Sequence, residues 1–263
     1  MRRGFLIFLG LGLALLFLPG TGGADLVLEE LPYRVSLGPW QEIGRANLTL
    51  TELSPGRYLA QFTARCQGVW SLLDGWLPDQ YQTEMSFRDG RLCPLVFREK
   101  VRIRGRRLVK EYRFDYQQGH LEYWRKINDR ELVRMWQVPL QEMVFDPLSL
   151  FYNLRLGVFG DLGGGGTIRV QGIPTPEPEE MVLAMGERTD QGRKIMLTIR
   201  EPKGGERGPF FFCTGTGPGW VPQDAWTRIF KIGKLAGHLE DSRGGMPKAW
   251  LNPPRQKLSS LGQ

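Results

Sequence analysis

One short segment, residues 144–157, constrains the fold of this chain more than any other. Asp146 is a favourable N-cap, because its carboxylate accepts the amide hydrogens that a first helical turn leaves without a partner. Pro147 suits the first helical position, where a missing N–H costs nothing. Gly157 suits the left-handed residue that follows many helices. The segment therefore predicts a helix over about residues 146–156.

This predicted helix is apolar around most of its circumference. Leu148, Leu150, Phe151, Tyr152 and Leu154 supply the apolar surface. Only Ser149 and Asn153, four residues apart, interrupt it with a narrow polar stripe. A helix of this kind is buried rather than laid on a surface, so the rest of the chain has to enclose it. Packing in the core is the simpler interpretation, and the alternative is that Phe151 and Tyr152 line an apolar ligand cavity.

Most of the remaining chain alternates between apolar and polar residues, as half-buried antiparallel strands do. In residues 57–66, for example, Tyr58, Ala60 and Phe62 share one face. Segments of 7–13 residues of this kind are joined by tight polar turns, such as Arg88-Asp89-Gly90-Arg91, which is typical of a β-meander. We expect residues 226–239 to supply the last strand. The pattern predicts a mainly β fold, either a curved antiparallel sheet or a partly closed β-barrel, with the helix packed on its concave face.

Residues 68–76 break the strand pattern and predict a short helical turn near 69–75. Trp70 and Trp76 would be exposed there, and we expect them to contact a ligand. Asp74 and Asp79 flank the same loop and form a possible carboxylate pair, although acids beside a turn usually only form the turn.

The N-terminus has the form of an export signal. Arg2 and Arg3 precede an apolar run from Phe5 to Leu18, which is too short to span a membrane comfortably. We expect a signal peptide over 1–24, a single mainly β domain over 25–245, a disordered tail over 246–263 and a periplasmic or secreted location. An uncleaved N-terminal anchor is the alternative, and no later segment is apolar enough to span a membrane.

The three cysteines and two histidines predict no metal or redox centre. Cys66, Cys93 and Cys213 are too few and too scattered for a disulfide framework, although one pair could bridge after export. His120 and His238 have no second ligand at metal spacing. The glycine runs match neither a phosphate loop nor a dinucleotide fingerprint. We therefore expect no cofactor, no metal and no catalytic residue identifiable from the sequence.

A basic stripe is the feature that most suggests a binding function. From Arg98 to Arg113 there are eight basic residues and two acidic ones. The expected patch consists of Arg98, Lys100, Arg102, Arg104, Arg106 and Arg107. Such a patch suits lipid phosphates, an acidic polysaccharide or an acidic protein. The plainer interpretation is a solvated hairpin face whose charges prevent edge pairing. Export argues against a nucleic-acid partner.

Several of these elements resemble a known family. The export signal, Tyr33-Arg34-Val35-Ser36, the loop at Trp70, and above all Asp146-Pro147-Leu148-Ser149 with Tyr152-Asn153-Leu154-Arg155 are similar to exported bacterial proteins of the domain of unknown function family numbered 3108. The resemblance spans roughly residues 31–240 and implies a periplasmic protein with a curved antiparallel sheet. It implies no activity.

The expected function is that of an exported, non-enzymatic envelope protein. It would bind a lipid, glycolipid or anionic polysaccharide in or on its curved sheet. A second possibility is an adaptor that docks an acidic envelope protein through the basic hairpin. A third is a hydrolase of envelope polymers that uses paired carboxylates.

Overall fold

A computed structural model describes residues 26–38, 40–67, 80–103, 105–160, 165–173, 177–189, 192–200, 206–214, 220–229 and 233–251. The first half of the chain forms β1 (Leu26–Leu37), β2 (Trp40–Ser54), β3 (Arg57–Cys66), β4 (Gln80–Arg88), β5 (Arg91–Ile103), β6 (Arg106–Asp115), β7 (His120–Ile127) and β8 (Val133–Pro139). The second half forms β9 (Val144–Phe145), α1 (Pro147–Arg155), β10 (Gly166–Gly172), β11 (Glu179–Thr189), β12 (Gly192–Arg200), β13 (Glu206–Thr214), β14 (Pro222–Ile229), β15 (Gly233–Leu239), β16 (Arg243–Gly244) and α2 (Lys248–Leu251). The expected helical turn near 69–75 lies outside the described residues.

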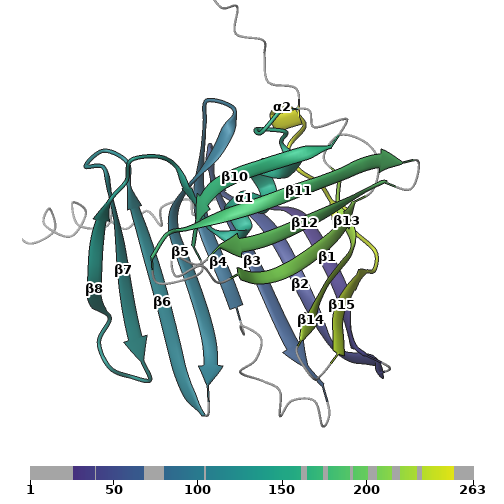
Figure 1. The fold of residues 1–263 in the computed structure, drawn as a ribbon. Helices are drawn as coiled ribbons and strands as arrows, with labels where there is room; N and C mark the ends of the chain where they lie inside the picture. Colours follow the sequence, from purple (N-terminus) through teal and green to yellow (C-terminus); the bar gives the residue numbers. More distant parts are fainter. Residues whose placement is uncertain are drawn as a thin grey trace, which may run out of the picture.

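The strands form one curved, almost wholly antiparallel sheet (Figure 1). Its order is β8-β7-β6-β5-β4-β3-β2-β1-β15-β14-β13-β12-β11-β10-β9, with β16 beside β1. Among the described strands, only β9 and β10 pair in parallel. β8 and β9 end the order and do not pair with each other, so the sheet is not closed into a barrel. The predicted mainly β fold and curved sheet are thus confirmed, in the open form.

The signals that predicted α1 all operate in the structure. The Asp146 carboxylate accepts hydrogen bonds from the backbone N–H groups of Leu148 and Ser149, and the Ser149 hydroxyl accepts one from the Asp146 N–H. After the helix, Gly157 has a positive φ of 73°. The N–H groups of Gly157 and Val158 donate to the carbonyls of Leu154 and Asn153, which is a Schellman C-terminus.

The segment from β9 into α1 is shared by all three hydrophobic clusters of the core. Leu148 and Tyr152 belong to the cluster over β1–β4, and Val144 belongs to the cluster over β5–β7. Phe145 and Leu150 belong to the cluster over β10–β13. Figure 1 shows α1 enclosed between β10–β12 and β3–β5. The helix therefore joins the two walls of the curved sheet.

The C-terminal part differs from the sequence-based expectation in two places. Residues 226–239 were expected to form one last strand, but they contribute to two, β14 and β15. The first part of the expected disordered tail, 246–251, contacts the core instead. The Trp250 ring is 4% exposed and lies between Tyr58 and Phe87, with ring centroids 4.5 and 5.2 Å away. The burial of this one large aromatic side chain accounts for the difference.

Candidate functional site

The polar stripe of α1 faces β5 rather than solvent. The Asn153 side chain is wholly buried, accepts a hydrogen bond from the Leu92 N–H (2.9 Å) and donates to the Leu92 carbonyl (2.8 Å). Its amide thus bonds to β5 as a neighbouring strand would. It also donates to the Ser149 carbonyl one turn earlier (2.8 Å). These hydrogen bonds give Asn153 a structural role, because they attach the helix to β5.

Asp146 has a similar role at the other end of the helix. It is wholly buried, and its Oδ1 accepts a hydrogen bond of 2.6 Å from the Thr83 hydroxyl in β4 in addition to its capping bonds. Burial raises the pKa of this carboxyl above its usual value, although its hydrogen-bond donors act in the opposite direction. Asp146 therefore attaches the start of the helix to the sheet.

A buried ion pair anchors the C-terminal end of α1. Arg155 and Glu29 bond in a bidentate manner at 2.6 and 2.7 Å, and their side chains are only 1% and 2% exposed. The Arg155 Nε also donates to the Trp220 carbonyl (2.7 Å). The Tyr152 hydroxyl lies 3.3 Å from the Glu29 carboxylate. Charge buried this completely requires such pairing, because desolvating an isolated ion costs several kcal/mol.

Two of the expected ligand-contacting residues are part of this core. Tyr152 is fully buried, and Phe151 is half-buried. The centroid of the Phe151 ring lies 5.0 Å from that of Tyr152 and 5.1 Å from the guanidinium carbon of Arg155. Their ligand-binding role stays a prediction, and the contacts that the structure gives them are those of packing. Trp70 and Trp76, with Asp74 and Asp79, lie outside the described residues.

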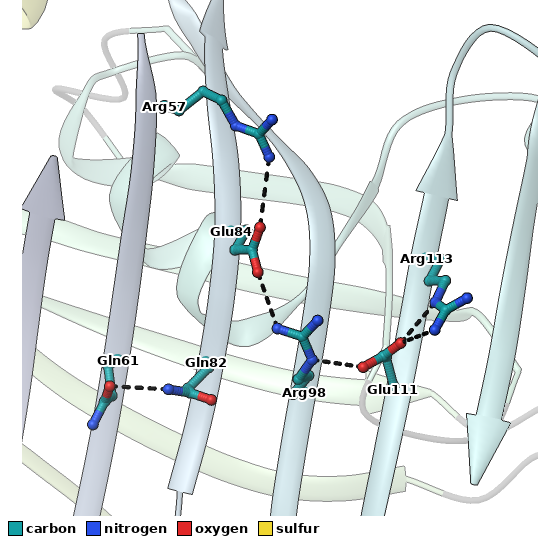
Figure 2. A network of polar contacts seen from close by, with 7 residues as sticks. All are labelled: Arg57, Gln61, Gln82, Glu84, Arg98, Glu111 and Arg113. Carbon is teal, nitrogen blue, oxygen red and sulfur yellow. Dashed lines mark hydrogen bonds and ion pairs between the residues drawn. The ribbon is translucent and has the colours of Figure 1, made fainter. Parts of the chain in front are cut away.

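The basic stripe separates into two parts, the first of which we call the paired belt. It crosses the outer face from Arg57, the first residue of β3, to β8, and Figure 2 shows its part over β3–β6. Arg57 contacts Glu84 (3.5 Å), which also contacts Arg98 (3.0 Å). Glu111 then joins Arg98 to Arg113, each at 2.6 Å.

The belt continues to the end of the sheet. The Arg113 guanidinium lies 4.4 Å from the centroid of the Trp124 ring. Trp124 and Arg134 both donate to Glu122, at 2.9 and 2.8 Å. Because Arg98 contacts both Glu84 and Glu111 on the neighbouring strands, little of its charge is left for a ligand.

The inner face behind the belt is aromatic. Phe62, Tyr81, Phe97, Tyr112, Tyr123 and Trp136 follow one another from β3 to β8. Successive ring centroids lie 4.9–6.2 Å apart. Phe97 and Tyr112 are wholly buried, so this row is part of the core.

The second part of the stripe, which we call the hairpin cluster, lies at the tip of β5–β6 and the adjoining end of β7. It consists of Lys100, Arg102, Arg106, Arg107 and Lys126. Arg102 lies directly opposite Arg107 in the register, and both are exposed. Lys100 and Lys126 flank Val109 on the same face, and Lys100 donates to the Gln80 side chain (2.8 Å).

The charges of this cluster have no counterion among the residues that the structure describes. Within the described ranges, none of its five members has an ion pair with a carboxylate. Like charges directly opposite each other destabilise a strand pair. An anion bound there would remove that cost. Arg104, at the tip itself, lies outside the described residues.

The sequence did not identify Lys126 as a member of the cluster, because membership depends on register. Val109 lies opposite Lys126 in β7 and opposite Lys100 in β5. The alternating pattern of residues 120–127 predicts a strand but not its alignment with β6. The sequence also did not show that Arg98 is neutralised, because Glu84 and Glu111 come from other strands.

Among the described residues, a thiol, a carboxylate and an imidazole lie close together on β13–β15, but not as a nucleophile beside its base. Cys213, Asp224 and His238 lie opposite one another across β13–β15, and His238 pairs with Asp224. The acid thus stands between the thiol and the imidazole. Burial, followed by the charge of Asp224, raises the pKa of the Cys213 thiol, which opposes thiolate formation. The three cysteines form no disulfide with one another.

Metal and membrane signatures are likewise not found in the described part of the chain. Those residues contain no group of three or more His, Cys, Asp or Glu side chains that could hold a metal ion. None of the described helices is long and apolar enough to cross a membrane. A shallow recess lies on the outer face, lined by Glu30, Pro32, Arg34, Glu240, Asp241 and Arg243. Its mixed charges do not suit an acyl chain.

Fold and site together define a protein with an open antiparallel sheet wrapped around one helix and an unpaired basic cluster at one hairpin tip. A family of proteins of unknown function, DUF3108, matches residues 32–175, which is more than half of the chain. The chain belongs to this family. The match includes α1, the paired belt and the hairpin cluster. Comparison with curated proteins and with solved structures found no match.

Proposed function

We propose that this is an exported, non-enzymatic envelope protein that binds the phosphate-bearing headgroups of an anionic lipid or glycolipid through the hairpin cluster. The observation that carries the proposal is that Arg102 lies opposite Arg107 and that neither has a carboxylate partner among the described residues. A few residues away on the same face, Arg57, Arg98, Arg113 and Arg134 all contact glutamates. The cluster therefore differs from the paired belt beside it.

Phosphate suits this geometry. Guanidinium groups bind phosphate oxygens in a bidentate manner, and the exposed side chains can converge on one anion. Each basic residue near an anionic lipid surface contributes about 1 kcal/mol. Binding should weaken as the salt concentration rises, because salt screens the attraction between exposed charges. The screening length is about 10 Å at 0.1 M ionic strength. An acyl chain inside the sheet is not part of the proposal, because α1 packs into the hydrophobic clusters of both walls there.

Export belongs to the proposal and is supported by the N-terminal sequence. Arg2, Arg3 and the apolar run of residues 5–18 have the composition of a signal peptide. Glu29, which anchors α1, lies only a few residues after the expected mature start at Asp25. Intact-mass measurement of protein recovered from the envelope fraction should give a chain that begins near Asp25. A full-length mass there would overturn this part of the proposal.

The binding test compares two double variants of equal charge change. Arg102→Gln/Arg107→Gln removes the unpaired charges. The control Arg57→Gln/Arg134→Gln removes two outer-face arginines of the belt, whose side chains are each 52% exposed. Binding is measured by co-sedimentation with phosphatidylglycerol–phosphatidylcholine vesicles and with phosphatidylcholine vesicles.

The mature wild-type protein should bind only the anionic vesicles, and the cluster variant should bind about 30-fold more weakly, which corresponds to two contacts of about 1 kcal/mol. The control should keep most of its affinity. Equal losses in both variants would mean that net charge alone matters and would overturn the proposal. Binding of a soluble acidic polysaccharide, with no binding to vesicles, would assign the cluster to a glycan instead.

A further inference from the structure

A second cationic and aromatic group lies on the outer face of the other wall, outside the family match. Phe211 in β13 lies opposite Trp226 in β14, and their rings stack with centroids 5.2 Å apart and planes at 17°. The Lys194 ammonium lies 4.5 Å from the Phe211 centroid, and the Lys234 ammonium lies 4.7 Å from that of Trp226. We call these four residues the lysine–aromatic stack. Both lysines are exposed, both rings are half-buried, and Met196 beside Phe211 is 36% exposed.

Like charges meet beside this stack as they do in the hairpin cluster. Arg228 lies directly opposite Lys234, and both are exposed. Within the described segments, neither has an ion pair with a carboxylate. Asp224, the acid on the same strand, is paired with His238. The stack therefore carries uncompensated positive charge next to apolar ring edges.

The two basic groups belong to one rim of the molecule. Because the neighbouring strands are antiparallel, the β1–β2, β5–β6, β7–β8 and β14–β15 connections all lie at the same edge of the sheet. Figure 1 shows these hairpin ends at the bottom of the molecule. The Gly38 N–H donates to the Lys234 carbonyl (2.7 Å), which joins two of the ends directly. We call this edge the lower rim.

A row of arginines connects the two groups close to this rim. Arg34, Arg45 and Arg65 lie opposite one another in β1, β2 and β3. Arg34 and Arg45 each have one carboxylate at 3.5 Å, and within the described residues Arg65 has none.

The turns at the opposite edge of the sheet carry both signs of charge. Near them, Glu52, Asp89 and Asp115 offset Arg57, Arg88 and Arg91, although Arg188 and Arg193 add positive charge at the β11–β12 ends. The lower rim also holds acids (Glu42, Asp129 and Glu131), but its basic residues outnumber them. An extended anionic surface complements this distribution better than a single small anion does.

We infer that the protein docks by its lower rim on an anionic lipid surface, with the lysine–aromatic stack as its interfacial anchor. Tryptophan is favoured at the headgroup level, where its polar edge and apolar body are both satisfied. Lysines beside it attract anionic lipids, as on peripheral amphipathic surfaces. The inference rests on the proposed headgroup binding and adds to it a second contact and an orientation.

The test uses the mature protein and vesicles of phosphatidylglycerol and phosphatidylcholine that carry bromine on their acyl chains, which quenches nearby tryptophans. Trp226→Phe removes the proposed reporter. Trp124→Phe is the matched control, because Trp124 is also a half-buried outer-face tryptophan with a cationic neighbour, but lies in the paired belt. Quenching should fall strongly in Trp226→Phe and stay at the wild-type level in Trp124→Phe. Unchanged quenching in Trp226→Phe would overturn the inference.

A second measurement keeps the two proposals distinguishable. Lys194→Gln/Lys234→Gln should weaken binding to anionic vesicles by about tenfold or more, whereas Arg57→Gln/Arg134→Gln should not. If the hairpin-cluster variant loses binding while the lysine variant keeps wild-type affinity, headgroup binding stands and rim docking fails. If wild type does not bind anionic vesicles at all, both proposals fail.

Discussion

The polar residues of α1 and those of the hairpin cluster are used by the structure in opposite ways. Asp146, Asn153 and Arg155 are buried, and each has specific partners in the sheet. Arg102 and Arg107 are exposed and face each other, and no described carboxylate forms an ion pair with either. Buried polar groups with specific partners in the sheet stabilise the architecture, whereas exposed ones without a described partner are available to a ligand. Substitutions at the two places should therefore separate stability from binding.

The largest effect should come from the buried ion pair. Arg155→Met leaves Glu29 charged and buried, so the free energy of unfolding should fall by about 3–5 kcal/mol. Urea denaturation followed by far-UV circular dichroism measures it. The double variant Glu29→Gln/Arg155→Met should recover part of the loss. A single variant as stable as wild type would show that the pair does not fix the helix.

Asn153→Leu should have the next largest effect. It leaves the N–H and C=O of Leu92 without partners inside the core, and one unsatisfied buried group costs about 1–3 kcal/mol. We expect a loss of roughly 2–3 kcal/mol. Hydrogen exchange supplies a local readout, because the Leu92 amide should exchange much faster than in wild type. Unchanged protection of that amide would contradict the assigned bond.

The paired belt should show an intermediate effect. Glu111→Gln removes the carboxylate shared by Arg98 and Arg113, whose side chains are 33% and 44% exposed. Solvent screens these pairs, so we expect a loss of about 1 kcal/mol. The difference from wild type in thermal unfolding should shrink in high salt. A loss as large as that of Arg155→Met would mean that the belt, too, acts as buried architecture.

The smallest effect, and the only gain, should come from the hairpin cluster. Arg102→Gln removes one of two like charges in register, so stability should stay constant or rise by a few tenths of a kcal/mol. Chemical denaturation at low salt is the most sensitive measurement. A clear loss of stability would show that Arg102 has a structural partner and would remove the contrast between cluster and helix.

Local signals explain how far the fold could be predicted. The cap at Asp146, the proline at Pro147 and the glycine at Gly157 act within one or two turns, and the helix begins and ends where they indicate. The turn at Asp89-Gly90 was also predicted, and both residues have the positive φ values, 50° and 74°, of a tight hairpin. Signals of this kind need no partner from elsewhere in the chain.

Features that depend on distant segments could not be predicted. Glu111 neutralises Arg98 only because β6 aligns with β5 in one register, and α2 forms where Trp250 finds a site between Tyr58 and Phe87. The site was therefore predicted in outline as a basic hairpin. Only the pairing of its charges shows which arginines remain available.

The position of β1 has a consequence for how the chain acquires its structure. This first strand lies in the middle of the sheet, between β2 and β15, and Tyr33 pairs with Leu239 near the other end of the chain. Glu29 likewise forms its ion pair with Arg155, more than a hundred residues later in the chain. Contacts of such long sequence separation form slowly, because the intervening chain must be ordered first. The sheet is incomplete until β15 has been synthesised, so we expect the chain to complete its fold only after most of it has been made.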